Sequence, residues 1–158
     1  MANEGELAPD VTLQMGDGST IRLSQLMRPL VLYFYPKDDT TGCTAEAKDF
    51  SALAGAFELE GVSLLGVSKN SPKDHAKFTA KYELKVPLAT DADGNVTEAF
   101  GTWVEKSMYG RKYMGIERAT FLIGEDGRIA RAWRKVSVPG HAEAVLAEAR
   151  ALKGGRSS

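Results

Sequence analysis

Cysteine and histidine are nearly absent from this chain of 158 residues. Cys43 is the only cysteine, and the two histidines, His75 and His141, lie far apart in the sequence. A single cysteine cannot form a disulfide within the chain, which is typical of proteins in a reducing compartment, so we expect a cytoplasmic protein. One cysteine and two distant histidines also supply too few ligands for a zinc site, so we expect no metal and no other cofactor.

Long apolar runs and an excess of charge are missing as well. No stretch approaches 18 consecutive apolar residues, so we expect no transmembrane helix. The first residues, Met-Ala-Asn-Glu-Gly-Glu, are acidic and lack the apolar core of a secretory signal. Lysine and arginine number 20 against 21 aspartates and glutamates, which provides no basic surface for nucleic acid or an anionic membrane.

The chain does have the length and composition of one ordinary globular domain. It is 43% hydrophobic and 26% charged, and a chain of this length buries roughly 70% of the surface that it exposes when unfolded. We expect a single domain over residues 1–152 and a flexible, glycine-rich polar tail over residues 153–158.

Apolar periodicity and turn residues predict alternating strands and helices. Residues 30–35 are apolar or aromatic throughout, which indicates a strand buried on both faces. Ser71 and Pro72 have the residue types that begin a helix. Phe50, Leu53, Ala54 and Phe57 have the spacing of one buried helical face. Strands are predicted at 11–15, 20–23, 30–35, 62–67, 87–90, 119–123 and 128–133, and helices from about residue 43 and at 72–82, 96–100 and 141–152.

This order predicts an α/β domain with a thioredoxin-like fold. Alternating strands and helices favour a central mixed β-sheet flanked by helices. The first two strands are expected to form an N-terminal β-hairpin, and a closing antiparallel hairpin followed by a helix is typical of the thioredoxin-like arrangement.

Cys43 is the first candidate for chemistry. It is expected in the first turn of a helix that follows a buried strand, where unpaired N–H groups and the helix dipole favour an anion. A thiol in such a position ionises more readily and becomes a better nucleophile. Gly42 would let the backbone approach a small ligand, and Thr40 or Thr41 would cap the helix. The alternative from position alone is a cysteine that serves as a small buried apolar residue.

The surrounding residues resemble a known family. Pro36-x-x-x-Thr40-x-x-Cys43 matches the P-x-x-x-T-x-x-C signature of peroxiredoxins, and the segment around it is similar to the peroxiredoxin Q branch, also called bacterioferritin comigratory proteins. The similarity continues in order along nearly the whole chain, in the blocks APDVTL, FYPKDDTTGCTAEAKDF, LGVSKNSPKDHAKF, YGRKYMGIERATFLI and WRKVSVPGHAEAVL.

The resemblance implies a thiol-dependent peroxidase that reduces hydrogen peroxide and organic hydroperoxides. Cys43 would be the peroxidatic nucleophile and would pass through a sulfenic acid. Thr40 would hydrogen-bond the thiolate and the peroxide, and Pro36 would shield the thiolate from water. Arg118 would point its guanidinium at Cys43, while Glu46 is either the orienting partner of a second basic residue or a plain helix glutamate.

The chain departs from the branch at Lys48. Many members have a resolving cysteine five residues after the first one, and this chain has a lysine there and no other cysteine. The resemblance is therefore to a single-cysteine peroxiredoxin that depends on an external thiol, such as thioredoxin, glutaredoxin or glutathione. The helix from Cys43 then has no need to unwind during the cycle. By analogy with the branch, we expect a monomer.

Three other functions compete with this interpretation. A thioredoxin-like disulfide reductase needs Cys-x-x-Cys, which Cys43-Thr-Ala-Glu46 lacks. A glutathione-peroxidase relative needs tryptophan and glutamine motifs that are not recognisable here. A non-enzymatic peroxide-sensing or thiol-redox interaction module is the third alternative.

Two further interpretations concern residues outside the motif. His75 is expected on a solvated helix face rather than in a catalytic site. Trp103, Met108 and Tyr109 are expected to lie in a loop, where they either line the site entrance or simply pack against the protein.

Overall fold

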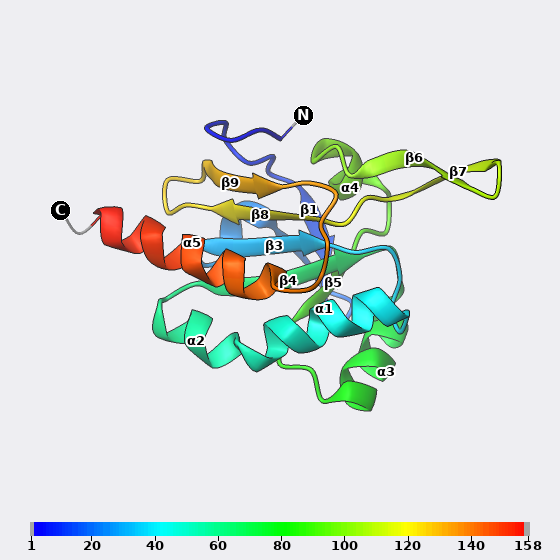
Figure 1. Cartoon of the computed structure of the whole chain (residues 1–158), viewed down its shortest axis with the longest axis horizontal. Helices are drawn as coiled ribbons and strands as arrows, with labels where there is room; N and C mark the ends of the chain where they lie inside the picture. The colour runs from blue at the N-terminus through cyan, green and yellow to red at the C-terminus, as the bar shows by residue number, and fades with distance from the viewer. Residues whose placement is uncertain (1, 157–158) are drawn as a thin grey trace.

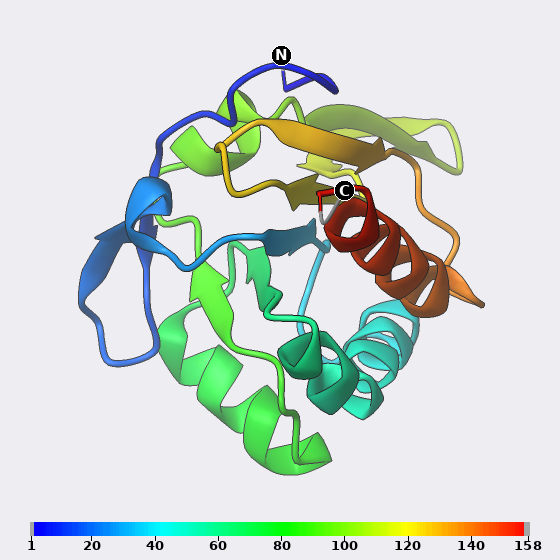
Figure 2. The ribbon, with the colours of Figure 1, turned by 90° about the vertical axis from the view of Figure 1, so that its left-hand side faces the viewer.

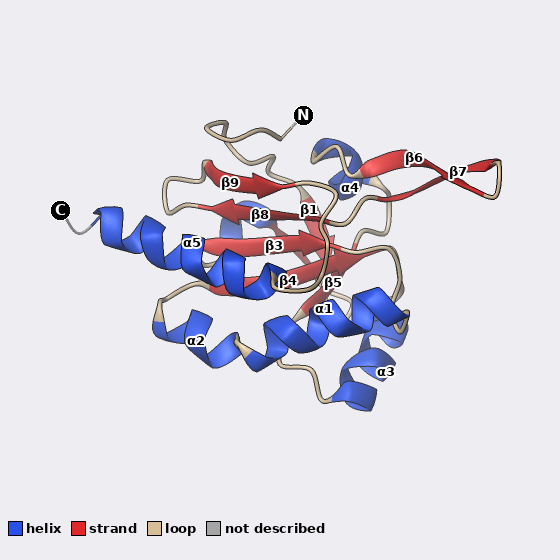
Figure 3. Ribbon diagram, in the orientation of Figure 1, coloured by secondary structure: helices blue, strands red, loops and turns tan. Residues whose placement is uncertain are grey.

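The computed structural model describes residues 2–156 and has a seven-stranded mixed sheet at its centre (Figure 1, Figure 3). β3, β4 and β5 are parallel to one another, and the strands outside them pair antiparallel. The strand order is β2-β1-β5-β4-β3-β8-β9. The strands are β1 (Thr12–Gln14), β2 (Thr20–Arg22), β3 (Leu30–Phe34), β4 (Ser63–Ser68), β5 (Leu88–Thr90), β8 (Ala119–Ile123) and β9 (Ile129–Trp133). The expected mixed sheet and N-terminal hairpin are both confirmed.

Helices cover the two faces of this sheet unequally. Leu32 and Phe34 of β3 pack with α4 on one face, while Val31 and Tyr33 face α1, α2, α3 and α5 on the other. Figure 2 shows these four helices on one side of the sheet. β3 is therefore buried on both faces, as its apolar sequence predicts. The helices are α1 (Thr41–Ala52), α2 (Ala54–Leu59), α3 (Pro72–Tyr82), α4 (Asn95–Ala99) and α5 (His141–Arg156), and a 3-10 turn spans Leu23–Gln25.

Local signals place the helix starts well but miss one interruption. At α3, the hydroxyl of Ser71 accepts a hydrogen bond from the Asp74 N–H, and Pro72 occupies the first helical position. The helix that carries Cys43 begins at Thr41, two residues earlier than expected, and it ends at Ala52 instead of continuing. α2 follows after Leu53, and because Phe50 and Phe57 are both fully buried, the apolar face continues across the break.

A second hairpin is the main element that the sequence pattern does not predict. β6 (Trp103–Met108) and β7 (Arg111–Ile116) form a separate two-stranded ribbon that projects from the molecule (Figure 1). Tyr109 and Gly110 both have positive φ at its turn, a backbone that suits two-residue hairpins. Met108 is 56% exposed and Tyr109 is 99% exposed, so the interpretation of these two as packed loop residues is wrong.

The last helix is longer than expected. α5 runs to Arg156, so the first four residues of the expected tail, 153–156, are helical, while residues 157 and 158 lie outside the described part. Within residues 2–156, no helix combines the length and the apolar character needed to cross a membrane.

Candidate active site

Cys43 lies where the central strand leads into the first helix. β3 ends at Phe34, residues 35–40 form a loop, and α1 starts at Thr41 with Thr40 as its extended N-cap residue. Cys43 is thus in the first turn, whose N–H groups have no acceptors within the helix. The residue is only 1% exposed. The thiol is therefore enclosed by protein at the positive end of a helix, the position that the sequence predicts.

Arg118 is the cation that meets the thiol. Its Nη2 donates a hydrogen bond to the Cys43 Sγ at 3.3 Å. The register between β3 and β8 explains why Arg118 reaches Cys43. Ala119 pairs with Phe34 in the sheet and so holds Arg118 beside the end of β3. Gly42 leaves room for the guanidinium: a Cβ at this glycine would lie 3.1 Å from Nη2. We expect the backbone at Gly42 to approach a small ligand, and the structure places the Arg118 side chain next to this position.

Glu46 orients the same guanidinium. It lies three residues after Cys43, on the same helical face, and its Oε1 accepts from Arg118 Nη1 at 2.7 Å. Its side chain is only 1% exposed. Burial raises the pKa of Glu46 to about 7, although Arg118 opposes this shift. Its other oxygen, Oε2, has no hydrogen-bond partner within residues 2–156. The partner of Glu46 is therefore Arg118 itself and not a second basic residue.

The charges around Arg118 also affect its own ionisation. Burial alone would lower the pKa of Arg118, but the charges of Glu46 and Cys43 outweigh burial and raise it above its ordinary value. His141 lies nearby at the start of α5, where burial, and to a smaller extent Arg118, lowers its pKa to about 4. His141 is therefore neutral at pH 7, and its Nε2 lies 2.8 Å from the Thr120 hydroxyl.

The two remaining motif residues, Thr40 and Pro36, make no hydrogen bond to the Cys43 thiol within residues 2–156. Thr40 is exposed and its hydroxyl donates to the carbonyl of Lys37 at 2.9 Å. It does not cap α1 with its side chain. Pro36 is half-buried at the start of the loop. The roles expected for these residues toward a bound peroxide stay predictions.

Lys48 occupies the position at which many members of the branch have a second cysteine. It is exposed on α1, and its Nζ lies 4.9 Å from the centroid of the Tyr82 ring on α3. This is a cation–π contact at the surface between two helices. No thiol other than Cys43 is available to the site, because the chain contains no other cysteine.

His75 is not on a solvated face, so that expectation is wrong. It is 3% exposed, and its Nδ1 lies 2.7 Å from the Oδ2 of Asp38, a buried residue of the loop between β3 and α1. One signal in the sequence could have indicated this burial: His75, Phe78 and Tyr82 have the i, i+3, i+7 spacing of a single helical face. Asp38 has no comparable signal, because it lies in a polar loop.

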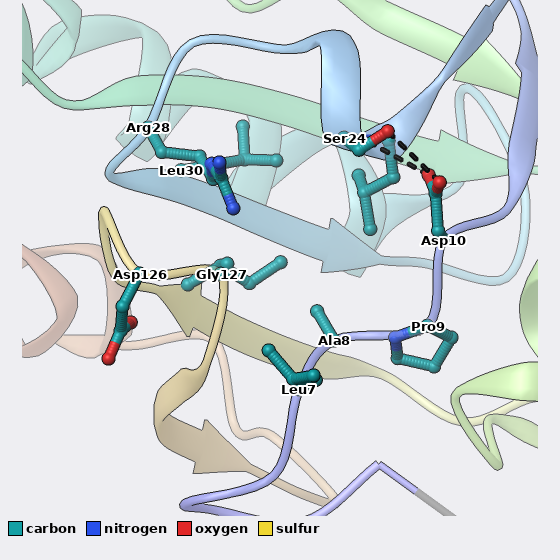
Figure 4. Close-up of a pocket in the computed structure, with 11 residues that line it drawn as sticks. Leu7, Ala8, Pro9, Asp10, Ser24, Arg28, Leu30, Asp126 and Gly127 are labelled. Atoms are coloured by element: carbon teal, nitrogen blue, oxygen red, sulfur yellow. Dashed lines mark hydrogen bonds between the residues drawn. The ribbon is translucent and has the colours of Figure 1, made fainter.

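A separate cavity of about 220 Å³ opens at the other end of β3. Figure 4 shows Leu7, Ala8 and Pro9 of the N-terminal segment facing Leu30, the first residue of β3, with Arg28 at one side. None of the residues that line it belongs to the Cys43 site, which follows the last residue of the same strand. The hydrogen-bonded groups around Cys43, rather than this cavity, are therefore the candidate active site.

Comparison with known proteins agrees with this geometry. Residues 5–132 match the AhpC/TSA family. The chain is 51% identical over 122 residues to peroxiredoxin Bcp of Xanthomonas campestris, covering 77% of this chain and 76% of that protein. It is 45% identical over 144 residues to peroxiredoxin Bcp of Bacillus subtilis, covering 90% of this chain and 91% of that one.

A solved structure shows the same fold. Peroxiredoxin Q of X. campestris superposes with a TM-score of 0.86 at 45% identity, covering 94% of this chain and 96% of that chain. The thioredoxin-like fold expected from the sequence is thereby confirmed, and a non-enzymatic role is not favoured by relatives of this kind. The chain belongs to the AhpC/TSA family and, within it, to the Bcp/PrxQ peroxiredoxins, so it is a thiol-dependent peroxidase.

Proposed function

We propose that Cys43 is the peroxidatic residue of this peroxidase. The observation that carries the assignment is the Arg118 guanidinium, which donates to Cys43 Sγ at 3.3 Å in the first turn of α1. The thiolate attacks one oxygen of a hydroperoxide. An S–O bond forms as the O–O bond breaks, and the departing oxygen takes a proton to leave as water or an alcohol. Cys43 is left as a sulfenic acid.

Arg118 stabilises the charge that moves along this path. Negative charge passes from sulfur through two oxygens, and donors already aimed at that line stabilise the transition state more than the ground state. Glu46 Oε1, at 2.7 Å from Arg118 Nη1, fixes the orientation of the guanidinium. The planar donor array of arginine can serve the sulfur and the peroxide oxygens together.

Thr40 and Pro36 complete the proposed site. The Thr40 hydroxyl commits its proton to Lys37 O, which leaves its oxygen lone pairs free to accept the O–H of a hydroperoxide. We propose that the ring of Pro36, which is half-buried at the start of the same loop, shields the thiolate from water.

The substrates in this proposal are hydrogen peroxide and organic hydroperoxides. A structural study of the bacterioferritin comigratory protein of X. campestris, which is 43% identical with a TM-score of 0.87, concerns alkyl peroxide reduction. We infer the same substrate class here from this similarity.

The second half of the cycle requires a thiol from another molecule. An external thiol attacks the sulfenic sulfur, which releases water and forms a mixed disulfide at Cys43. A second thiol then displaces Cys43 as a free thiol and leaves as the disulfide of the reductant. Thioredoxin, glutaredoxin and glutathione are the candidates, and the cytoplasm, which is supplied with reduced thiols, is the proposed compartment.

We propose a monomer with one domain over residues 1–152. Cys43, Arg118 and Glu46 all come from one chain, so the proposed chemistry needs no partner subunit. One sheet and its two apolar layers draw residues from the whole length of this range, which supports a single cooperative unit.

The test of the proposed function is Cys43→Ser. We expect peroxide consumption in the presence of thioredoxin, glutaredoxin or glutathione to fall to background, because a serine hydroxyl cannot replace the thiolate. Circular dichroism should show the parent secondary structure, since serine is close in size to cysteine. Appreciable turnover by the folded variant would show that Cys43 is not the nucleophile.

A further inference from the structure

Three buried side chains form a hydrogen-bonded cluster beside the Cys43 loop, and the proposed chemistry does not use them. The Tyr35 hydroxyl donates to Asp38 Oδ1 at 2.6 Å. The other oxygen of Asp38 lies 2.7 Å from His75 Nδ1, and His75 Nε2 lies 3.1 Å from the carbonyl oxygen of Ala89. We call Tyr35, Asp38 and His75 the loop anchor. All three are less than 9% exposed.

The contacts of His75 determine where its protons lie. A backbone carbonyl only accepts hydrogen bonds, so Nε2 must carry a proton. A carboxylate oxygen at 2.7 Å from Nδ1 requires a second proton between them. The anchor is therefore a buried, hydrogen-bonded pair of an imidazole and a carboxyl group, and removing one partner leaves buried polar atoms of the other without a hydrogen bond.

The anchor joins the loop to elements distant in sequence. His75 lies on α3, and Ala89 lies on β5, while Asp38 lies in the middle of the loop. The backbone N–H of Asp38 also donates to Asn70 Oδ1 at 2.9 Å. Asp38 is thus held through both its side chain and its backbone.

Asp38 lies midway between two residues of the motif. Pro36 precedes it by two positions and Thr40 follows it by two, and Thr41 then begins α1. The next residue, Asp39, has φ of 59°, a conformation uncommon outside glycine, which the surrounding contacts must maintain. Fixing Asp38 therefore fixes the path of the chain from β3 to the turn that carries Cys43.

We propose that Asp38 and His75 are positioning residues for peroxide reduction. They hold Pro36, Thr40 and the first turn of α1 in register with Arg118, and they do not themselves touch the substrate. The inference rests on the proposed function of Cys43, because its kinetic effect is read at that residue.

The kinetic test measures the second-order rate of Cys43 oxidation by hydrogen peroxide per folded protein. Asp38→Ala and His75→Phe should each lower this rate at least tenfold. Asp38→Asn should stay within threefold of the parent, because its amide can donate to His75 Nδ1 while its oxygen still accepts from Tyr35. Rescue by asparagine distinguishes positioning through these bonds from a requirement for charge.

Lys81→Ala is the matched control. Lys81 lies on the same helix as His75 and donates to the adjacent loop residue, Asp39, at 2.8 Å, but this pair is exposed. Exposed pairs contribute little, so the control should oxidise within twofold of the parent rate. Should Asp38→Ala not fold, Tyr35→Phe keeps the Asp38–His75 contact, removes the hydroxyl that lies 2.6 Å from Asp38 Oδ1 and 3.3 Å from His75 Nδ1, and should lower the rate about threefold.

A second measurement is independent of peroxidase activity. Proton NMR of the parent should show a strongly downfield signal from the proton in the short hydrogen bond between His75 Nδ1 and Asp38, and Asp38→Asn should lose this signal. Absence of this hydrogen-bonded proton signal in the parent would overturn the anchor. Oxidation at the parent rate in both His75→Phe and Asp38→Ala would also overturn it. If Asp38→Ala does not fold, Tyr35→Phe takes its place in this comparison. Loss of activity in Asp38→Asn equal to that in Asp38→Ala would overturn it too. A parent protein that consumes no peroxide contradicts the proposed function instead and leaves the NMR result standing.

Discussion

The Arg118 guanidinium donates one hydrogen bond to the sulfur of Cys43 and another to the carboxylate of Glu46. Burial leaves Glu46 with a pKa of about 7, so near neutral pH it is close to equally distributed between its charged and neutral forms. The guanidinium remains charged throughout, because its pKa is raised above its ordinary high value. Arg118, which stabilises the reaction, therefore keeps its charge, whereas the charge of Glu46, which orients Arg118, depends on pH.

Loss of Arg118 should slow peroxide reduction. We expect Arg118→Ala to oxidise about tenfold or more slowly, which corresponds to about 1.4 kcal/mol of lost transition-state stabilisation. Stopped-flow measurement of Cys43 oxidation would test this. Arg131→Ala is the control, because Arg131 pairs with Glu4 and Glu148 and makes no contact with Cys43 among those described. An Arg118→Ala rate equal to that of the parent would place this arginine outside the reaction.

Two buried groups should make opposite contributions to stability as the pH changes. Between pH 4.5 and 7 the folded state holds the Glu46 proton more tightly than the unfolded state does, so stability falls as pH rises. For His141, with a pKa lowered from 6.5 to about 4, the unfolded state binds more protons, so stability rises with pH. The two contributions therefore oppose each other over most of this range.

Glu46→Gln should unmask the His141 contribution. We expect the free energy of unfolding of this variant to rise between pH 4.5 and 6.5 more steeply than that of the parent, because the opposing carboxyl is gone. Urea unfolding at several pH values measures the slope, and Glu58→Gln, at an exposed position on α2, is the control. Equal slopes in Glu46→Gln and the parent would show that Glu46 does not titrate with a raised pKa.

At the scale of elements, the start of α1 is shaped by its fit to Arg118. Gly42 is a helical position at which any side chain would meet the guanidinium, with a Cβ 3.1 Å from Nη2. A glycine inside a helix ordinarily weakens it by about 0.5–1 kcal/mol relative to alanine. Close approach of Arg118 is the physical reason for a glycine at this point.

Gly42→Ala should therefore separate stability from activity. We expect the helix to gain from alanine but the guanidinium to shift by a few tenths of an ångström, which should lower the peroxide rate severalfold. Gly55→Ala on α2 is the matched control, because nothing lies within 4 Å of a Cβ there. The control should be stabilised by about 0.5–1 kcal/mol with an unchanged rate. A Gly42→Ala rate equal to that of the parent would contradict the close fit, and thermal unfolding gives the stability of both variants.

α1 also explains why Lys48 cannot simply be replaced by a resolving thiol. Two residues five apart on an intact helix are separated by about 7.5 Å along the axis. A disulfide needs Cα atoms roughly 4.4–6.8 Å apart. Lys48→Cys would therefore form a disulfide with Cys43 only if α1 unwinds. The native chain, with lysine at this position, can keep α1 folded through its cycle.

At the scale of the whole molecule, the absence of a second cysteine limits turnover. In the absence of external thiol we expect one equivalent of peroxide to be consumed and Cys43 to remain as a sulfenic acid. Excess peroxide should carry it to sulfinic acid, since no thiol in the chain competes for it. Mass spectrometry after trapping with a sulfenate reagent measures the first product. Sustained turnover in a thiol-free assay would refute this expectation.

Much of the architecture follows from local patterns in the sequence. The apolar run of β3, the Ser71-Pro72 start of α3 and the apolar face of α5 act over a few residues, so their periodicity and capping predict the elements. The sequence does not predict the β6–β7 hairpin, because its exposed strands bury little surface and lack regular apolar alternation.

Local patterns in the sequence place a single thiol at the start of a helix, and the composition excludes a second thiol to resolve it. The groups that surround this thiol come from distant segments and are brought together by the fold. The pairing of β8 with β3 brings Arg118 to Cys43 across 75 residues of sequence, and packing buries Glu46 and His75. These contacts depend on sheet register and on the burial of polar groups against distant elements. A helix or strand pattern reports only the neighbours within a few residues, so it cannot specify either.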